Sequence, residues 1–103
     1  MKTLNEHGVC TDPERIDIYF KDHLNCIQIK IAETASGWAD GYDLADRTGG
    51  MCTPCTLNGC STREQSITHA LDQIVQTRIV QENPKYKKAI RVFEAERIEQ
   101  TLF

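Results

Sequence analysis

Ile27-Gln28-Ile29-Lys30-Ile31 is the stretch of sequence that decides the fold. Isoleucine stands at every second position with a polar side chain between, which is the period-two pattern of a β-strand with one face on a core. Isoleucine is also branched at Cβ, and branched side chains fit a pleated, half-buried surface. We therefore predict a strand here, packed on one side against a hydrophobic layer.

A second strand is predicted on the N-terminal side of this stretch. Ile16, Ile18 and Phe20 occupy alternate positions, and the polar segment 21–25 that follows suits a turn back into the isoleucine strand. The preceding residues, 1–13, are largely polar and end in an Asp-Pro pair. We expect them to form a loosely ordered arm.

A third strand is predicted over residues 38–45, after a turn at 34–37. The even-numbered residues from Trp38 to Leu44 fall on one face of this strand. Gly41 weakens the strand, because glycine has no side chain to pack and loses more backbone freedom than other residues. Three consecutive strands joined by short turns predict an antiparallel meander.

Two helices are predicted in the second half of the chain. The segment 61–64 reads Ser-Thr-Arg-Glu, which has the form of a capping box. The helix that it opens is expected to run to about Gln81, and Asn83 and Pro84 then begin a second helix that continues towards Gln100. Apolar side chains at helical spacing give the first helix a face that can cover the sheet. They are Ile67, Ala70, Leu71, Ile74, Val75 and Ile79.

These elements predict an α+β fold: a three-stranded antiparallel meander covered by one amphipathic helix, plus a C-terminal helix. A chain of 103 residues suits a single domain over 1–103. No run approaches the roughly 18 apolar residues needed to cross a bilayer, and no signal peptide is visible at the start. We therefore expect a cytoplasmic protein that does not contact membranes.

The chain is mildly acidic, with a formal net charge of −3. Dedicated DNA-binding domains are usually basic, because contacts with phosphates dominate their affinity. The composition therefore argues against direct, sequence-specific binding of nucleic acid and leaves docking on a basic protein surface open. No nucleophile elbow, HExxH motif or P-loop appears in the sequence, so we expect a binding protein rather than an enzyme.

The segment 46–60 is predicted to be a long loop rich in cysteine and glycine. Cys52 and Cys55 are two residues apart, and Cys60 could add a third sulfur to a zinc ion, although a structural zinc site needs four ligands. The candidates for the fourth ligand are Cys10, Cys26, His7, His23 and His69. Simple packing of free thiols is the competing interpretation. A zinc-stabilised adaptor, a DNA-associated accessory protein or a thiol-dependent enzyme would be the corresponding alternative functions.

The segment from residue 26 to about residue 79 resembles a small domain found in proteins of phages and other bacterial mobile elements. The shared features are a strand pair around Gly37-Trp38, a loop with Gly49, Gly50 and Pro54, and a helix opened by Ser61-Thr62-Arg63-Glu64-Gln65. Similar patterns occur in some type I anti-CRISPR proteins and in domains of phage methylase-like and partition-like proteins. This loop carries three cysteines where those relatives tend to have glycine or serine.

The resemblance implies a small inhibitor that occupies the nucleic-acid-facing surface of a host defence complex. Its acidic side chains would meet the Lys/Arg clusters that normally hold phosphate, and exposed aromatic side chains would anchor the contact. The candidates are Asp40, Asp43 and Asp46, together with Trp38 and Tyr42. Packing of the aromatic residues in the core and a solvated acidic edge are the competing interpretations.

The C-terminal helix offers a second group of candidate partner-binding residues. Lys87, Lys88 and Arg91 form a basic cluster that can touch phosphate or an acidic partner. A solvated helix face explains the same cluster without a partner. The sequence ends in Leu102 and Phe103, which could dock in an apolar pocket of a partner or pack back onto the domain.

Overall fold

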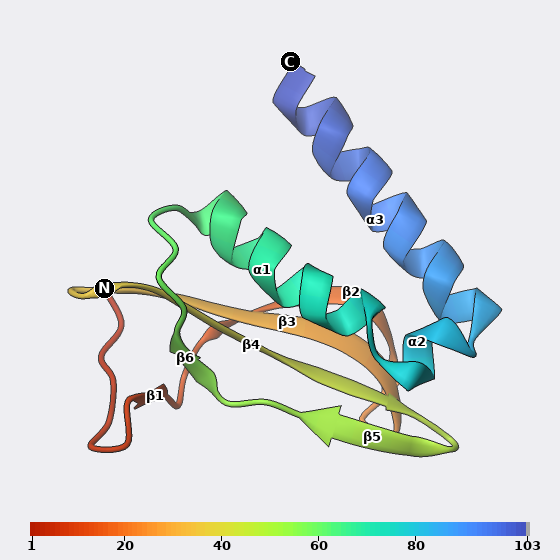
Figure 1. Cartoon of the computed structure of the whole chain (residues 1–103), viewed down its shortest axis with the longest axis horizontal. Helices are drawn as coiled ribbons and strands as arrows, with labels where there is room; N and C mark the ends of the chain where they lie inside the picture. Colours follow the sequence, from red (N-terminus) through yellow and green to blue (C-terminus); the bar gives the residue numbers. More distant parts are fainter. Residues whose placement is uncertain (103) are drawn as a thin grey trace.

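The computed structural model describes the backbone of residues 1–102 and the side chains of residues 1–98. Over this part of the chain, an antiparallel sheet of six strands carries three helices (Figure 1). The elements in chain order are β1 (Val9–Cys10), β2 (Glu14–Asp22), β3 (Asn25–Thr34), β4 (Gly37–Asp46), β5 (Gly49–Cys52), β6 (Cys55–Leu57), α1 (Arg63–Val75), α2 (Arg78–Gln81) and α3 (Pro84–Leu102). The predicted α+β class is confirmed.

The three predicted strands are present as β2, β3 and β4, which form an antiparallel meander. Two-residue turns join them, closed by the pairs Asp22↔Asn25 and Thr34↔Gly37. The sheet is larger than predicted, because its strand order in the described residues is β1-β6-β4-β3-β2 and β5 also pairs with β4. The meander is therefore one half of a wider sheet.

The segment 46–60, predicted to be a loop, forms β5 and β6, which pair in succession with one edge of β4. Between β5 and β6, Thr53 continues the hydrogen bonding with β4. Its Oγ1 accepts a hydrogen bond from Tyr42 N at 2.8 Å, and its N donates to Tyr42 O at 2.8 Å. A Cβ on Gly41 would lie 2.5 Å from the carbonyl oxygen of Pro54. Glycine at position 41 is thus required by the close approach of the two chain segments.

The hydrophobic core lies between the sheet and the helices. Figure 1 shows α1 lying across β3 and β4, as predicted for the amphipathic helix. Ile27, Ile29 and Ile31 of β3 are fully buried beneath it. The other buried members of this core are Tyr42, Leu44, Ile67, Ala70, Leu71, Ile74, Val80, Tyr86 and Ile90.

The first predicted helix is divided into α1 and α2 near Thr77. The Thr77 hydroxyl donates to the Ile74 carbonyl at 2.7 Å, and its oxygen accepts from Val80 N as the N-cap of α2. A threonine side chain that bonds to nearby backbone groups competes with helix continuation. The cap of α1 is Thr62, one residue later than predicted, because its Oγ1 accepts from Gln65 N at 3.1 Å.

The N-terminal arm, residues 1–13, which the sequence predicts to be loosely ordered, lies against the sheet. Lys2 N donates to Glu33 O at 2.8 Å, and β1 pairs with β6. Cys10 and the half-buried Leu4 pack on a second apolar cluster, which lies on the face of the sheet opposite α1. The other members of this cluster are Ala32, Ala39 and Cys55. The arm therefore covers one end of that face.

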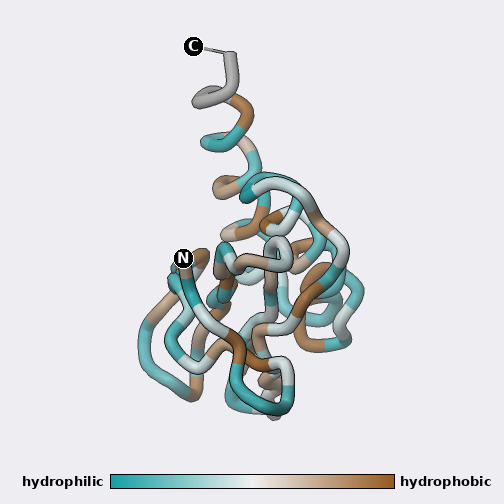
Figure 2. The backbone as a smooth tube through the Cα atoms, turned by 90° about the vertical axis from the view of Figure 1, so that its left-hand side faces the viewer, coloured by the Kyte–Doolittle hydropathy of each residue, from teal (hydrophilic) through white to brown (hydrophobic). Residues whose placement is uncertain are grey.

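The last helix, α3, packs at its start on β2 and α2 and then extends beyond the sheet (Figures 1 and 2). Its exposed residues include Val92 and Ile98. Arg97 still reaches α1, where its guanidinium donates to Glu64 and Thr68 at 3.1 Å. None of the helices within residues 1–102 combines the length and apolar character needed to cross a membrane.

Candidate binding groove on the open sheet face

The face of the sheet opposite α1, here called the open face, carries polar side chains from the central strands. Strand alternation sends the three isoleucines of β3 into the core and so turns Gln28 and Lys30 to the open face. On β4, Asp43 stands directly opposite Gln28 in the antiparallel register and projects to the same side. The arm covers the end of this face around Ala32 and Ala39 and leaves the other end uncovered.

An ion cluster occupies the middle of the open face. The Asp43 carboxylate accepts from Lys30 Nζ at 3.0 Å and from Arg15 Nη1 at 2.6 Å. The Lys30 side chain is only 7% exposed, so its charge depends on Asp43 for compensation. Burial raises the pKa of Asp43, but hydrogen bonds from the Cys52 thiol and the two cations outweigh burial and lower that pKa to about 2. Asp43 is therefore ionised at neutral pH.

Cys52 is the one exposed thiol among the five cysteines, all of which lie in the described part of the chain. Its hydrogen bond to Asp43, together with partial burial, raises the pKa of this thiol. The Lys30 ammonium, 3.6 Å from Sγ, opposes the shift without reversing it. Cys52 is thus a protonated thiol at neutral pH and a weak nucleophile, because the thiolate is the reactive form.

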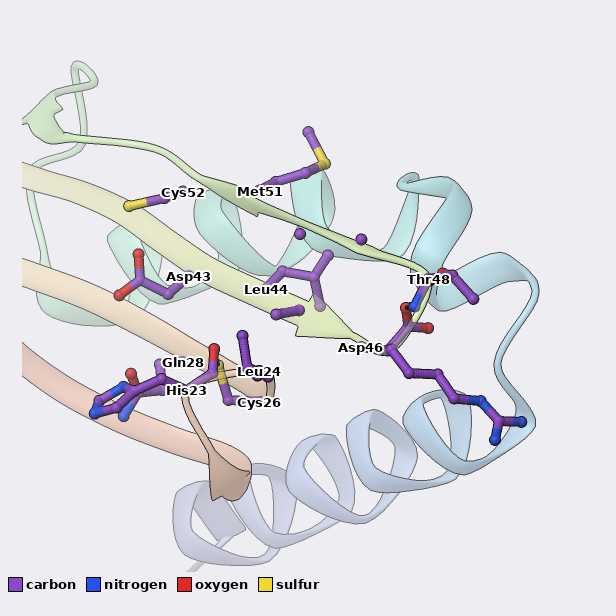
Figure 3. A pocket seen from close by; sticks show the side chains of 14 residues that line it. His23, Leu24, Cys26, Gln28, Asp43, Leu44, Asp46, Thr48, Met51 and Cys52 are labelled. Atoms are coloured by element: carbon purple, nitrogen blue, oxygen red, sulfur yellow. Dashed lines mark hydrogen bonds between the residues drawn. The ribbon is translucent and has the colours of Figure 1, made fainter.

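Beside the ion cluster, the open face is hollowed into a groove of about 760 Å³ (Figure 3). In Figure 3, side chains of the β2–β3 turn and side chains of β5 stand on either side of Asp43. The residues that line the groove are His23, Leu24, Cys26, Gln28, Asp43, Leu44, Ala45, Asp46, Arg47, Thr48, Gly49, Gly50, Met51 and Cys52. The floor therefore belongs to β3 and β4, and the walls belong to the β2–β3 turn, the β4–β5 turn and β5.

Large apolar side chains are exposed at the rim of the groove. Leu24 in the β2–β3 turn is 74% exposed, and Met51 on β5 is 45% exposed. Phe20, which is 43% exposed, packs edge-on against His23 with ring centroids 5.4 Å apart. Phe20 reaches the open face because a register shift in β2 between Asp17 and Tyr19 reverses the alternation that begins at Ile16.

Two carboxylates flank these apolar side chains. Hydrogen bonds from the neighbouring Asn25 lower the pKa of Asp22, and those from Thr48 lower the pKa of Asp46, so both are ionised at neutral pH. Neither has a cation within ion-pair distance in the part of the chain that the structure describes. Arg47 adds one positive charge to the lining. The groove thus combines an apolar rim with acidic side chains.

No protein-family model, curated protein or solved structure matches this chain. The resemblance to mobile-element proteins therefore stays a prediction from the sequence. The function has to be inferred from the groove and from the placement of the other candidate residues.

Three of the predicted partner-binding residues lie on the core side of the sheet. Tyr42 is 4% exposed, Asp40 is 5% exposed, and Trp38 is half-buried against the main core. Strand alternation is the reason, since the even-numbered residues of β4 from Trp38 to Leu44 face α1. Asp40 and Tyr42 cannot contact a partner in this fold, which corrects the prediction, whereas Asp43 and Asp46 do line the groove.

Asp40 instead forms the centre of a buried hydrogen-bond network, which is not among the features predicted from the sequence. His69 Nδ1 lies 2.9 Å from both carboxylate oxygens, Ser66 Oγ donates at 3.1 Å, and the Asn58 amide also donates. Burial raises the pKa of Asp40, and the hydrogen bond from His69 opposes that rise. His69 Nε2 lies 3.3 Å from the amide nitrogen of Gln73, a donor, so Nδ1 carries the proton in neutral His69.

This network lacks the arrangement of a nucleophile and its base. Ser66 is fully buried and donates to Asp40 and to the Ala39 carbonyl, not to the imidazole. A catalytic hydroxyl would have to donate to the imidazole. The network therefore ties α1 and the segment before it to β4. The spacing of Ser66 and His69, which lie one turn apart on one side of α1, was the signal in the sequence.

The predicted zinc ligands lie in three different surroundings. Cys52 is exposed on β5, Cys55 is buried on β6 and Cys60 is half-buried before α1. No three His, Cys, Asp or Glu side chains converge on one point among the residues that the structure describes. Zinc binding by these cysteines stays a prediction. Elemental analysis of protein purified without chelator would measure it, and one zinc per chain would require this segment to rearrange.

The basic residues of the last helix are accessible. Lys87, Lys88 and Arg91 are all exposed on α3, outside the lining of the groove. Their role in binding a partner stays a prediction. The side chain of Leu102 and the whole of Phe103 lie outside the described residues, and so does the predicted docking of this end.

Proposed function

We propose that this protein works by binding another protein through the groove, and that its partner is a host complex that targets nucleic acid. The observation that carries the proposal is an uncovered concave surface of about 760 Å³ with Leu24 and Met51 exposed in its lining and Phe20 packed on the lining residue His23. Large apolar side chains gathered on one concave surface are typical of interaction sites, whereas isolated ones are ordinary. In this proposal the protein inhibits by occupancy rather than by catalysis.

Two carboxylates that form no ion pair with any described side chain, Asp46 in the lining and Asp22 beside Leu24, favour a basic partner surface, although Arg47 in the lining offsets part of this charge. Asp22 and Asp46 are ionised and lack ion-pair partners among the described residues. An apolar rim flanked by carboxylates complements a surface on which Lys and Arg surround apolar side chains. Surfaces of that kind hold the phosphates of nucleic acids. The charge and the resemblance to anti-CRISPR proteins therefore favour the same class of partner.

The floor of the groove is organised before binding. It belongs to β3 and β4, each of which is paired with neighbouring strands on both sides. The carboxylate of Asp43 is held in place by Lys30 and Arg15. A surface that does not have to be ordered on binding avoids part of the entropic cost of association. A small protein with such a surface can compete with nucleic acid for its partner.

A gel-shift assay with a guide-loaded type I CRISPR effector complex tests the proposal. Excess wild-type protein should prevent the complex from binding its target DNA. The double variant Leu24→Ser/Met51→Ser should require at least a tenfold higher concentration, because a buried apolar anchor contributes more than about 1 kcal/mol and about 1.4 kcal/mol is a factor of ten. Val92→Ser is the matched control, since Val92 is 49% exposed on α3 outside the groove, and it should inhibit as the wild type does.

Two results would contradict the proposal in different ways. If the double variant inhibits as strongly as the wild type, the contact surface is not the groove. If wild-type protein fails to inhibit every complex in a panel of type I effectors, the class of partner is wrong. Circular dichroism of the variants would establish that a loss of inhibition does not come from unfolding.

A further inference from the structure

Cys10 and Cys55 face each other across β1 and β6. They are direct partners in the antiparallel register, and both are free thiols. Directly opposed residues of antiparallel strands project to the same side, with Cα atoms about 4.5 or 5.5 Å apart according to the hydrogen-bonding pattern. Both distances fall within the range of about 4.4–6.8 Å that a disulfide spans. The register therefore places these two thiols within bonding reach in either case.

The surroundings of this pair are small and mostly apolar, apart from the Asp12 carboxylate, which accepts a hydrogen bond from the Cys10 thiol at 3.5 Å. Cys10 is 2% exposed and Cys55 is 1% exposed, and both pack on Ala32 and Ala39. Burial, and after it the neighbouring Cys10, raises the pKa of the Cys55 thiol to about 11. The influence of one thiol on the other indicates that they are close. In contrast, Cys52 has no cysteine opposite it on β4, because its register partner is Asp43.

We propose that Cys10 and Cys55 form a disulfide that fixes the N-terminal arm to the sheet when the protein meets an oxidised thiol such as glutathione disulfide. The thiolate of one cysteine attacks a sulfur of glutathione disulfide and displaces one glutathione thiolate. The thiolate of the other cysteine then attacks the mixed disulfide and displaces the second. Two electrons pass from the protein thiols to glutathione disulfide, and the two thiol protons end on two molecules of glutathione.

The arm has to open before this exchange begins. In the closed arm both thiols are shielded from solvent, and the high pKa of Cys55 makes its thiolate rare at neutral pH. The arm is held by few backbone contacts, namely the two-residue strand β1 and the bond from Lys2 N to Glu33 O. Elements with so few contacts open at low free-energy cost. Closure of the arm then returns Cys10 to its position opposite Cys55, where the second exchange completes the bond.

The disulfide links residues that are far apart in the sequence. It therefore removes conformational freedom from the unfolded chain and stabilises the folded state. It also prevents the arm from opening, because β1 can no longer separate from β6. Oxidation would in this way fix the covered end of the open face, while the groove lies at the other end.

Peptide mapping identifies the bond if two other cysteines are first removed. Trypsin releases Cys10 in the peptide 3–15, but Cys52, Cys55 and Cys60 fall together in the peptide 48–63. The double variant Cys52→Ser/Cys60→Ser leaves Cys55 as the single thiol of that second peptide. After incubation with glutathione disulfide and alkylation of free thiols, non-reducing mass spectrometry should find the two peptides linked. The melting temperature should rise by about 5 °C or more and fall again with dithiothreitol.

The variant Cys10→Ser in the same background should lose both the link and the rise in melting temperature. Glutathione adducts without the link, or a link from either peptide to the peptide 22–30 that carries Cys26, would overturn the proposed pairing. A link without any rise in melting temperature would overturn the claim that the bond fixes the arm. Mapping of the oxidised wild-type protein, which does not depend on the folding of any variant, should find the peptide 3–15 linked to the peptide 48–63, and the absence of this link would overturn the proposal.

Discussion

Replacement of Asp43 by asparagine removes the anion that compensates the buried ammonium group of Lys30. The pKa of Asp43 is about 2, against an ordinary value of about 3.9 for aspartate, and this difference corresponds to about 2.5 kcal/mol of folding free energy at neutral pH. The variant loses that contribution and leaves Lys30, at 7% exposure, without its carboxylate. We expect Asp43→Asn to lower the free energy of unfolding by about 2–4 kcal/mol at neutral pH.

The pH dependence separates this effect from a general loss of packing. Because the pKa of Asp43 is lower in the folded state, its contribution is complete above the unfolded pKa and is lost as the pH falls through the folded value. From about pH 5 down to about pH 1, the wild type should lose about 2.5 kcal/mol through this carboxyl, and Asp43→Asn should not. Urea unfolding at several pH values, followed by the fluorescence of the single tryptophan, Trp38, measures both quantities.

Two further variants test the physical reason. Asp72→Asn changes an exposed carboxyl on α1 and should leave the free energy of unfolding at neutral pH within about 0.5 kcal/mol of the wild-type value. The double variant Asp43→Asn/Lys30→Met should recover part of the stability lost in Asp43→Asn, since it leaves no buried charge without a partner. Parallel pH curves for the wild type and Asp43→Asn, or a loss below about 0.5 kcal/mol at neutral pH, would refute the role assigned to the ion cluster.

Gly41→Ala should lower the free energy of unfolding by about 1–3 kcal/mol, because the new Cβ would lie 2.5 Å from the Pro54 carbonyl oxygen. Thermal unfolding measures the loss, and an unchanged midpoint would contradict the close approach of Gly41 and Pro54. Alkylation of Cys52 by iodoacetamide at neutral pH should be slower than that of free cysteine and should become faster in Asp43→Asn, because the carboxylate raises the pKa of the thiol. Equal rates in the two proteins, resolved by peptide mass, would count against this hydrogen bond. His69→Ala should lower the free energy of unfolding by about 1–3 kcal/mol, because the buried carboxylate of Asp40 loses a hydrogen-bond donor. Chemical denaturation measures this loss, and an unchanged free energy of unfolding would contradict the role of His69.

The central strands could be predicted because burial acts on every second residue of a strand. Ile27, Ile29 and Ile31 are all fully buried, so the period-two pattern in the sequence directly reflects the contact with α1. The same pattern in β4 correctly groups Trp38, Tyr42 and Leu44 on one face. It does not by itself tell whether that face meets a helix or a partner, so the sequence alone also allows Tyr42 to be predicted on a binding surface.

The remaining parts depend on contacts between distant residues. Glycine and proline in the segment 46–60 are local signals for a loop, but the unpaired edge of β4 offers backbone partners that make β5 and β6 possible. Phe20 continues the alternation of Ile16 and Ile18 in the sequence, yet the register shift in β2 turns it to the open face. No local pattern contains that shift. The groove, beside which Phe20 packs on His23, could therefore not be predicted from the sequence.

The short turns of the meander have a consequence for the order in which the chain folds. The pairs Asp22↔Asn25 and Thr34↔Gly37 close their hairpins over two intervening residues, whereas Val9 pairs with Thr56 from a remote part of the chain. Bringing remote segments together costs more chain entropy, so local pairings form earlier. We expect the meander to assemble first and the arm to dock last. Pulsed amide exchange during refolding would then find late protection in β1, and early protection there would exclude this sequence of events.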